Sequence, residues 1–224
     1  MQKPKAFLFD LNGTMINDMP FHIKAWHRIF NEQGAMFSME QSKLECYGKN
    51  DEILDRIFPG KFSESEKNKI SINKEKQYQK EFRPHLKLID GLDKFLQKAN
   101  DANIKMAIGS AAIMFNIDFV LDGLNIRNYF GALVSADDVK KSKPDTETFL
   151  QCAEKLHIAP VDCIVFEDSP KGVEAATKAG MKSVVITTMH TKEEFYDDNI
   201  IYFIENYHEG LFETLVNLNC EDSC

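Results

Sequence analysis

The stretch AFLFDLNGTMIND, residues 6–18, decides the fold of this chain. It opens with the apolar run Ala6–Phe9, which is typical of a buried strand. The run stops at Asp10, and the Asn-Gly-Thr sequence at 12–14 favours a turn. In open α/β sheets, ligands bind beyond the carboxyl ends of the strands. Asp10 is therefore placed to act as a metal ligand, a nucleophile or both.

The composition fits a globular chain with room for one large domain, or for one domain with an insert. The 224 residues are 43% hydrophobic and 28% charged, and the formal net charge is −8. That charge argues against nucleic-acid and membrane partners. No apolar run is long enough to cross a bilayer, and the N-terminus lacks the apolar region of a signal peptide. We expect a cytoplasmic monomer or weak dimer.

The cysteines argue against both a zinc site and a disulfide framework. There are five of them, an odd number, and none forms a Cys-x-x-Cys pair. Cys220 and Cys224 lie in a polar tail, where a frayed terminus is the preferred interpretation over a redox role. The others are Cys46, Cys152 and Cys163.

Residues 18–85 contain helical patterns and no convincing strand. Apolar residues recur at helical spacing over 21–30 and again over 51–58. Ser63 and Glu66 have the spacing of a capping box, which predicts the start of a long polar helix toward Arg83. Pro84 then marks a boundary. We interpret 18–85 as an inserted, all-helical domain.

Strands and helices alternate after residue 85. This pattern predicts right-handed βαβ units and a doubly wound, mainly parallel sheet, formed by residues 1–17 and 86–224. The expected helices span 91–102, 118–124 and 146–156, with another ending at Ala179-Gly180, and the expected strands span 105–109, 132–135, 163–166, 184–187 and 201–204, the last at an edge.

Parallel strands bring their carboxyl ends to one edge of the sheet, so the polar residues there should form one site. Asp10, Ser110, Glu167 and Asp168 each follow an expected strand, and Lys143 lies in a nearby loop. An aspartate can accept a phosphoryl group. A hydroxyl, a cation and a Mg²⁺ ion can then stabilise the charge on the phosphoryl oxygens.

Together these segments resemble the four motifs of the haloacid dehalogenase superfamily, over residues 6–180. The resemblance implies a Rossmann-like core and the following roles: Asp10 as nucleophile, Ser110 with Ala111 as phosphate-binding residues, Lys143 as the cation, and Asp10, the backbone carbonyl of Asn12, Glu167 and Asp168 as Mg²⁺ ligands.

The position of the helical insert resembles the cap of the β-phosphoglucomutase-like subfamily, a lid that closes over the site. By that resemblance His22 either orients catalytic groups or packs between helices, and Lys49 and Lys74 are substrate-binding candidates. Trp26 is expected in the core. Asp51 falls near the place of the arginine that holds a second phosphate in the mutase, which argues against mutase activity.

Asn12 departs from the family pattern, which has an aspartate there as general acid and base. An amide cannot move this proton, and such catalysis is worth about 10²–10⁴-fold. Three explanations stay open: an engineered residue that traps a complex, a leaving group that needs little protonation, or a chain that binds without turnover. Asp18 is a further acid nearby, with no geometric argument in its favour.

The sequence therefore predicts a Mg²⁺-dependent phosphatase that acts on a small phosphorylated metabolite. The alternatives are a β-phosphoglucomutase-type sugar-phosphate mutase and a catalytically weakened protein that binds phosphorylated ligands.

Overall fold

Six parallel strands form one sheet at the centre of the chain. The computed structural model describes residues 3–218, so Cys220 and Cys224 lie outside the described residues. The sheet order is β3-β2-β1-β4-β5-β6, which confirms the doubly wound parallel sheet and its last strand at an edge. The strands are β1 (Ala6–Phe9), β2 (Lys105–Gly109), β3 (Ala132–Val134), β4 (Cys163–Glu167), β5 (Lys182–Ile186) and β6 (Ile200–Ile204).

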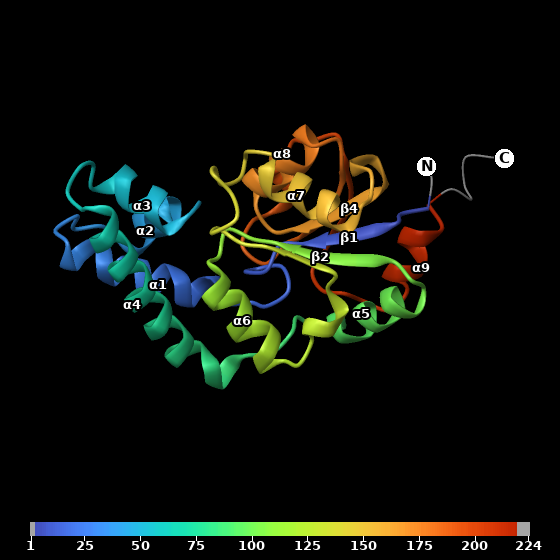
Figure 1. Ribbon diagram of the computed structural model, residues 1–224, viewed down its shortest axis with the longest axis horizontal. Coiled ribbons are helices and arrows are strands. Elements are labelled where there is room, and N and C mark those ends of the chain that lie inside the picture. The colour runs from blue at the N-terminus through green and yellow to red at the C-terminus, as the bar shows by residue number, and fades with distance from the viewer. Residues whose placement is uncertain (1–2, 219–224) are drawn as a thin grey trace.

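Alternate residues of β1 pack against helices on opposite faces of the sheet. Phe7 and Phe9 face the cluster of α5 (Leu92–Asp101), α6 (Met114–Gly123) and α9 (Leu211–Val216). Ala6 and Leu8 face the cluster of α7 (Glu147–Leu156) and α8 (Pro170–Lys178). Figure 1 shows α7 and α8 above the sheet and α5 and α9 below it. Because both faces are covered, β1 is apolar throughout.

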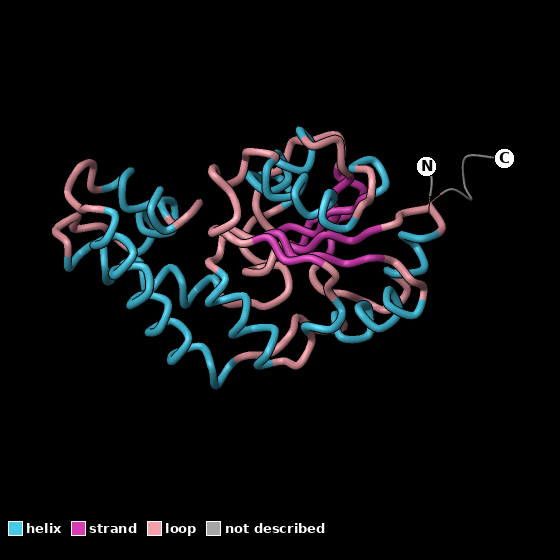
Figure 2. The backbone as a smooth tube through the Cα atoms, viewed as in Figure 1, coloured by secondary structure: helices cyan, strands magenta, loops and turns pink. Residues whose placement is uncertain are grey.

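Four helices inserted between β1 and α5 form a separate layer, the cap; the sheet with α5–α9 is the core (Figures 1 and 2). The cap helices are α1 (Met19–Glu32), α2 (Met39–Glu45), α3 (Asn50–Ile57) and α4 (Glu64–Phe82), followed by a 3-10 turn at Arg83–His85. They enclose their own apolar cluster of Trp26, Phe30, Ile53 and Leu54. The described part of the insert consists of helices joined by loops, with no strand, as predicted, and Trp26 is buried in the apolar cluster of the cap.

Several helix boundaries differ from the prediction. The helix expected at 118–124 begins at Met114, and α2 and α9 were not predicted. The start of α6 is hard to detect because its residues are apolar on most sides and therefore lack a clear 3.6-residue period. Within residues 3–218, no helix is both long and apolar enough to cross a membrane.

Candidate active site

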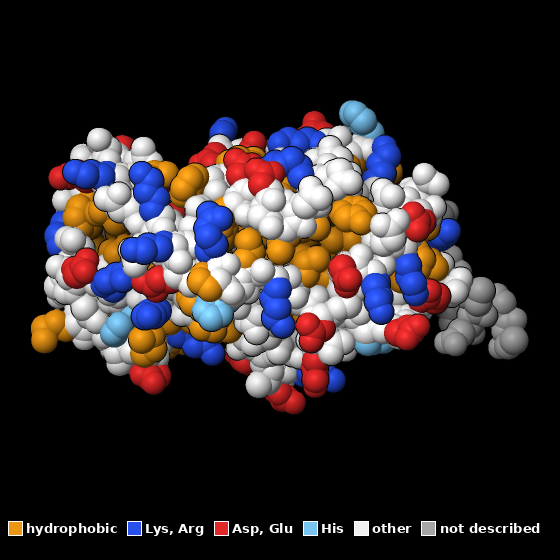
Figure 3. Space-filling model, turned by 90° about the horizontal axis from the view of Figure 1, so that it is seen from below, with side chains coloured by type: hydrophobic (Ala, Val, Ile, Leu, Met, Phe, Trp, Pro, Cys, Tyr) orange, Lys and Arg blue, Asp and Glu red, His pale blue; other side chains and the backbone are white. Residues whose placement is uncertain are grey.

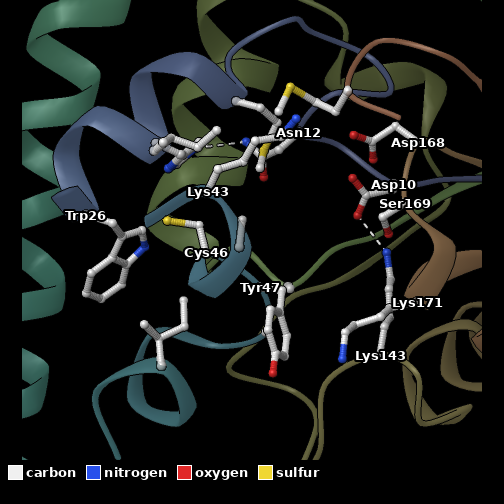
Figure 4. A pocket seen from close by; sticks show the side chains of 18 of the residues that line it. Asp10, Asn12, Trp26, Lys43, Cys46, Tyr47, Lys143, Asp168, Ser169 and Lys171 are labelled. Atoms are coloured by element: carbon white, nitrogen blue, oxygen red, sulfur yellow. Dashed lines mark hydrogen bonds and ion pairs between the residues drawn. The ribbon is translucent and has the colours of Figure 1, made fainter. Parts of the chain in front are cut away.

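Asp10, Lys143 and Glu167 meet at the carboxyl edge of the sheet. The pairing of Phe9 with Phe166 places Asp10 beside Glu167, and both side chains are buried. The Lys143 ammonium donates to Asp10 Oδ1 at 2.6 Å and to Glu167 Oε1 at 2.8 Å. Figure 4 shows Asp10 and Lys143 joined in this way at one side of the pocket. The structure thus brings together three residues from separate parts of the chain.

Glu167 also organises the start of α8. Its Oε2 accepts hydrogen bonds from the backbone N–H groups of Asp168 and Ser169, both at 2.8 Å, and from Ser169 Oγ at 2.9 Å. With Lys143 on Oε1, both oxygens of Glu167 are engaged by protein groups. The role of Glu167 as a metal ligand stays a prediction, and its described contacts hold Lys143 and the helix N-terminus in place.

Asp168 approaches the turn after β1 so closely that only glycine fits there. Gly13 has a φ of +78°, and a Cβ on it would lie 2.0 Å from Asp168 Oδ2. The Thr14 hydroxyl donates to Asp168 Oδ1 at 3.4 Å. The turn therefore sets the Asp168 carboxylate against the backbone next to Asn12.

The site holds more buried negative charge than positive charge. Burial raises the pKa of Asp10 to about 7, even though Lys143 acts in the opposite direction. Burial, and then the Glu167 and Asp10 carboxylates, raise the pKa of Asp168 well above its ordinary value. Burial alone would lower the pKa of Lys143, but Asp10 and Glu167 outweigh it and the pKa is raised. One ammonium faces three carboxylates, and a divalent cation would correct that imbalance.

The donor set suits Mg²⁺ rather than a metal held by many protein ligands. Among residues 3–218, no group of three or more His, Cys, Asp or Glu side chains converges into a metal cluster. Mg²⁺ typically takes one or two carboxylates and completes its octahedron with water and substrate oxygens. Asp10, Asp168 and the carbonyl of Asn12 fit that pattern.

A pocket of about 550 Å³ lies between the core and the cap. Its walls include Ser110 and Ala111, which follow β2, as well as Asn12, His22 and Lys74. Figure 4 shows Trp26, Cys46 and Tyr47 across the pocket from Asp10 and Asp168. The predicted phosphate-binding loop and part of the cap therefore face the same space.

Lys74 and His22 belong to a buried network on the cap side of the pocket. Lys74 Nζ lies 2.8 Å from His22 Nδ1 and donates to Glu75 Oε1 at 2.9 Å. Glu75 also accepts from Asn50 at 2.8 Å and from Asn116 at 2.6 Å. The sequence analysis did not identify Glu75, Asn50 or Asn116. They come from α4, α3 and α6, and no local pattern links them.

Lys49 takes a different position from the one that its candidate role requires. Its ammonium donates to the backbone carbonyl of Val139 at 3.0 Å, and Lys49 is absent from the described pocket walls. The cations that do line the outer pocket are Lys43, on α2, and Lys171, on α8. Lys171 Nζ lies 3.8 Å from the centre of the Tyr47 ring, so it joins core to cap.

A second contact between cap and core involves Glu52 and Ser142. Glu52 Oε1 accepts from the backbone N–H of Ser142 at 3.1 Å, and Oε2 accepts from the Ser142 hydroxyl. Burial tends to raise the pKa of Glu52, but the bonds to Ser142 and Lys49 outweigh burial and lower it. Since Ser142 precedes Lys143, the cap holds the loop that carries the site's cation.

The match to a known family covers both β1 and the strands that complete the site. A family model described as haloacid dehalogenase-like hydrolase matches residues 7–186. The chain belongs to this family. The order of motifs and the α/β core with a helical cap make it a β-phosphoglucomutase-like member.

Named relatives of the family are enzymes that act on phosphorylated compounds. β-Phosphoglucomutase from Bacillus subtilis is 31% identical, over 80% of this chain and 82% of that protein. Fructose-1-phosphate phosphatase from Escherichia coli is 29% identical, over 80% of this chain and 94% of that protein. The structure of β-phosphoglucomutase from Clostridium difficile has a TM-score of 0.82 and 26% identity, with 95% of each chain covered. These likenesses support a phosphatase or phosphomutase type of enzyme.

Proposed function

We propose that this family member is a Mg²⁺-dependent phosphatase of a small phosphorylated metabolite, with Asp10 as the nucleophile. The observation that carries the proposal is the cluster of Asp10, Lys143 and Asp168 facing the pocket between core and cap. Asp10, Asp168 and the carbonyl of Asn12 would hold the ion, which when bound offsets negative charge on the phosphoryl oxygens.

Asp10 forms a bond from a carboxylate oxygen to phosphorus, and the bond from phosphorus to the leaving oxygen breaks with its electron pair. Lys143 holds Asp10 Oδ1 at 2.6 Å and places a positive charge beside the transferred group. Water then attacks the phosphorus of the aspartyl phosphate, which releases inorganic phosphate and restores Asp10. Ser110 lines the pocket where a phosphoryl oxygen needs a donor.

Asn12 sets the choice of leaving group. Its amide does not deliver a proton at neutral pH, so the leaving oxygen departs unprotonated or takes its proton from water. We therefore expect acyl and aryl phosphates, whose leaving groups are weak bases, to react much faster than alkyl phosphates. The physiological substrate should carry a leaving group of the same kind.

The arrangement of cap cations supports a phosphatase over a mutase. A mutase must hold a second phosphate on its substrate, and bidentate arginine contacts suit that task. Here Lys49 is bound to Val139, and Lys74 is neutralised by Glu75. Position 51, next to Asn50 at the start of α3, carries an aspartate.

The test is turnover of acetyl phosphate, p-nitrophenyl phosphate and hexose monophosphates with and without Mg²⁺. We expect Mg²⁺-dependent turnover, fastest for acetyl phosphate, that is lost by at least about 10³-fold in Asp10→Asn. Asp93→Asn, the same change on the exposed face of α5, is the matched control and should keep full activity.

Activity that survives in Asp10→Asn would show that Asp10 is not the nucleophile. A chain that turns over none of these substrates, yet is protected against heating by phosphate with Mg²⁺, would instead be a binding protein.

A further inference from the structure

Asp18 is a fully buried carboxylate at the start of the cap, and Asn12 is bonded directly to it. Asn12 Nδ2 donates to Asp18 Oδ2 at 2.6 Å, and the Tyr78 hydroxyl donates to the same oxygen. Asp18 has no exposed surface, and its Oδ1 is buried without a hydrogen-bond partner among the described residues. Although Asp18 precedes α1, its side chain does not cap that helix. Its described partners therefore point to a role other than helix capping.

The neighbouring histidine fixes the direction of these hydrogen bonds. His22 stacks on Tyr78 with ring centres 3.9 Å apart. Its Nδ1 lies 2.8 Å from the Lys74 ammonium, which can only donate, so Nδ1 accepts and the proton resides on Nε2. Nε2 lies 3.2 Å from Asp18 Oδ2 and is free to donate to it. The approach of 3.1 Å between Nε2 and Asn12 Nδ2 is then a contact of two donors that share one acceptor.

These contacts also fix the orientation of the Asn12 amide. An ionised carboxylate has only acceptor sites, so the NH₂ group of Asn12 must face Asp18 and its oxygen must face away. A carboxylate at position 12 would place two negative groups at hydrogen-bond distance in a buried site. Like charges at this distance cannot both stay ionised without a large cost. At neutral pH one of the two would have to take up a proton, at a cost in stability, whereas an amide donates to Asp18 without that cost.

We propose that Asn12 and Asp18 are a coupled acid–amide pair, in which Asp18 is a positioning residue that favours an amide at position 12. A carboxylate at position 12 is therefore accepted without a cost in stability only when position 18 carries no carboxylate. The pairing rests on the contacts above. Its catalytic consequence, that position 12 lacks a proton donor because of Asp18, rests on the proposed function.

The acid and the amide can be swapped between positions 12 and 18 without changing the net charge or the number of carboxylates. In the double variant Asn12→Asp with Asp18→Asn, the hydrogen bond between the two positions forms with donor and acceptor interchanged. His22 Nε2, which lies 3.1 Å from the position 12 side chain, can then donate to the new carboxylate, and the Tyr78 hydroxyl can accept from the new amide. Thermal unfolding of wild type, both single variants and the double variant measures the coupling, with no ligand present. We expect Asn12→Asp to lower Tm by about 5 °C or more. The Tm of the double variant should be about 5 °C or more above the Tm expected if the Tm changes of the two single variants were additive.

Asn50→Asp is the matched control, because Asn50 also donates to a buried carboxylate, that of Glu75, at 2.8 Å. It should lose stability as Asn12→Asp does, and adding Asp18→Asn should not restore it. If Asn12→Asp fails to fold, a folded double variant supports the pairing. Additive changes in Tm, or rescue of Asn50→Asp by Asp18→Asn, would overturn it.

Turnover of an alkyl phosphate supplies the catalytic readout. The double variant should exceed wild type in kcat by about 10²-fold, with Asn12→Asp at least about tenfold below the double variant. Equal kcat in Asn12→Asp and the double variant would overturn the positioning role of Asp18. If the Tm changes are coupled but no variant turns over any phosphorylated substrate, the pairing of Asn12 with Asp18 is supported. The proposed phosphatase activity is then contradicted.

Discussion

Glu75 is a buried carboxylate whose charge is sustained entirely by its neighbours. Burial by itself would raise the pKa of Glu75, but the Lys74 ammonium and the hydrogen bond from Asn50 outweigh it and lower the pKa to about 2. Asn116 adds a bond from the core at 2.6 Å. A carboxylate with a lowered pKa stabilises the fold above its unfolded pKa, and this contribution disappears as the pH falls toward the folded value.

Glu75→Gln should therefore lower the free energy of unfolding by about 3 kcal/mol at pH 7, because Lys74 loses its counter-charge. The difference from wild type should shrink as the pH falls from about 4.5 toward 2. Urea unfolding at pH 7 and pH 3.5 measures both values. Glu213→Gln, which breaks an exposed ion pair with Lys98, is the control and should leave the midpoint nearly unchanged. A pH-independent difference would contradict the assigned role of the Glu75 charge.

The motif residues were predictable because each follows a strand or lies in a recognisable loop. Asp10, Ser110, Lys143 and Asp168 all line the pocket, as expected from the rule that parallel strands end at one edge. The tight bond between Asn12 and Asp18 was not predictable in the same way. Tyr78, whose hydroxyl also donates to Asp18, comes from α4. The packing of α1 on α4 brings the three residues together.

At the scale of elements, the turn after β1 couples the backbone of the loop that follows Asp10 to Asp168. A Cβ at Gly13 would displace the Asp168 carboxylate, because it would lie 2.0 Å from Oδ2. Gly180 has a similar φ of +74° with nothing within 4 Å of its Cβ position. The two glycines have the same backbone conformation, but only Gly13 has another residue, Asp168, beside its Cβ position.

Without metal, Gly180→Ala should lose about 1 kcal/mol of stability from backbone strain, and Gly13→Ala should lose more, because its Cβ also pushes the Asp168 carboxylate aside. Only Gly13→Ala should also lose the rise in Tm that Mg²⁺ gives to the wild type, since only it moves a proposed ligand. Differential scanning fluorimetry with and without Mg²⁺ separates the two effects. An unchanged Mg²⁺ response in Gly13→Ala would argue against Asp168 as a ligand.

The strands along the chain, their parallel pairing and the helical nature of the insert were predictable from the sequence pattern, but short helices were not. Helix α2 is seven residues long and packs on α1, so tertiary contacts supply much of its stability. The sequence nevertheless contains a signal for the start of α2. Ser38 and Gln41 form a capping box at its start, and that spacing can be read from the sequence.

At the scale of the whole molecule, polar pairs join the cap to the core, among them Glu52 with Ser142, Glu75 with Asn116 and Lys49 with Val139. Positive and negative side chains are interspersed on the face seen in Figure 3. The cap is therefore held against the core by specific pairs such as Glu52 with Ser142. Because Ser142 precedes Lys143, opening of the cap should also release the Lys143 loop.

Ser142→Ala should weaken closure, because Glu52 loses one of its hydrogen-bond donors, at a cost of about 1–2 kcal/mol. Amide hydrogen exchange should speed up about tenfold in residues 48–53 and around Lys143. Ser38→Ala removes a serine that caps α2 within the cap and is the control. It should leave exchange at these two segments unchanged. Slow exchange in Ser142→Ala would show that the cap is held by other contacts.

The position of β1 in the sheet also constrains how the protein is made. β1 leaves the ribosome before the other strands of the sheet, and its sheet partners begin only at Lys105 and Cys163. The cap helices, by contrast, find one another within a short span and can enclose Trp26 and Phe30 early. β1 therefore has two unpaired edges until β2 has emerged, and one unpaired edge until β4 has emerged. We expect the nascent chain to need a chaperone until β4 has emerged.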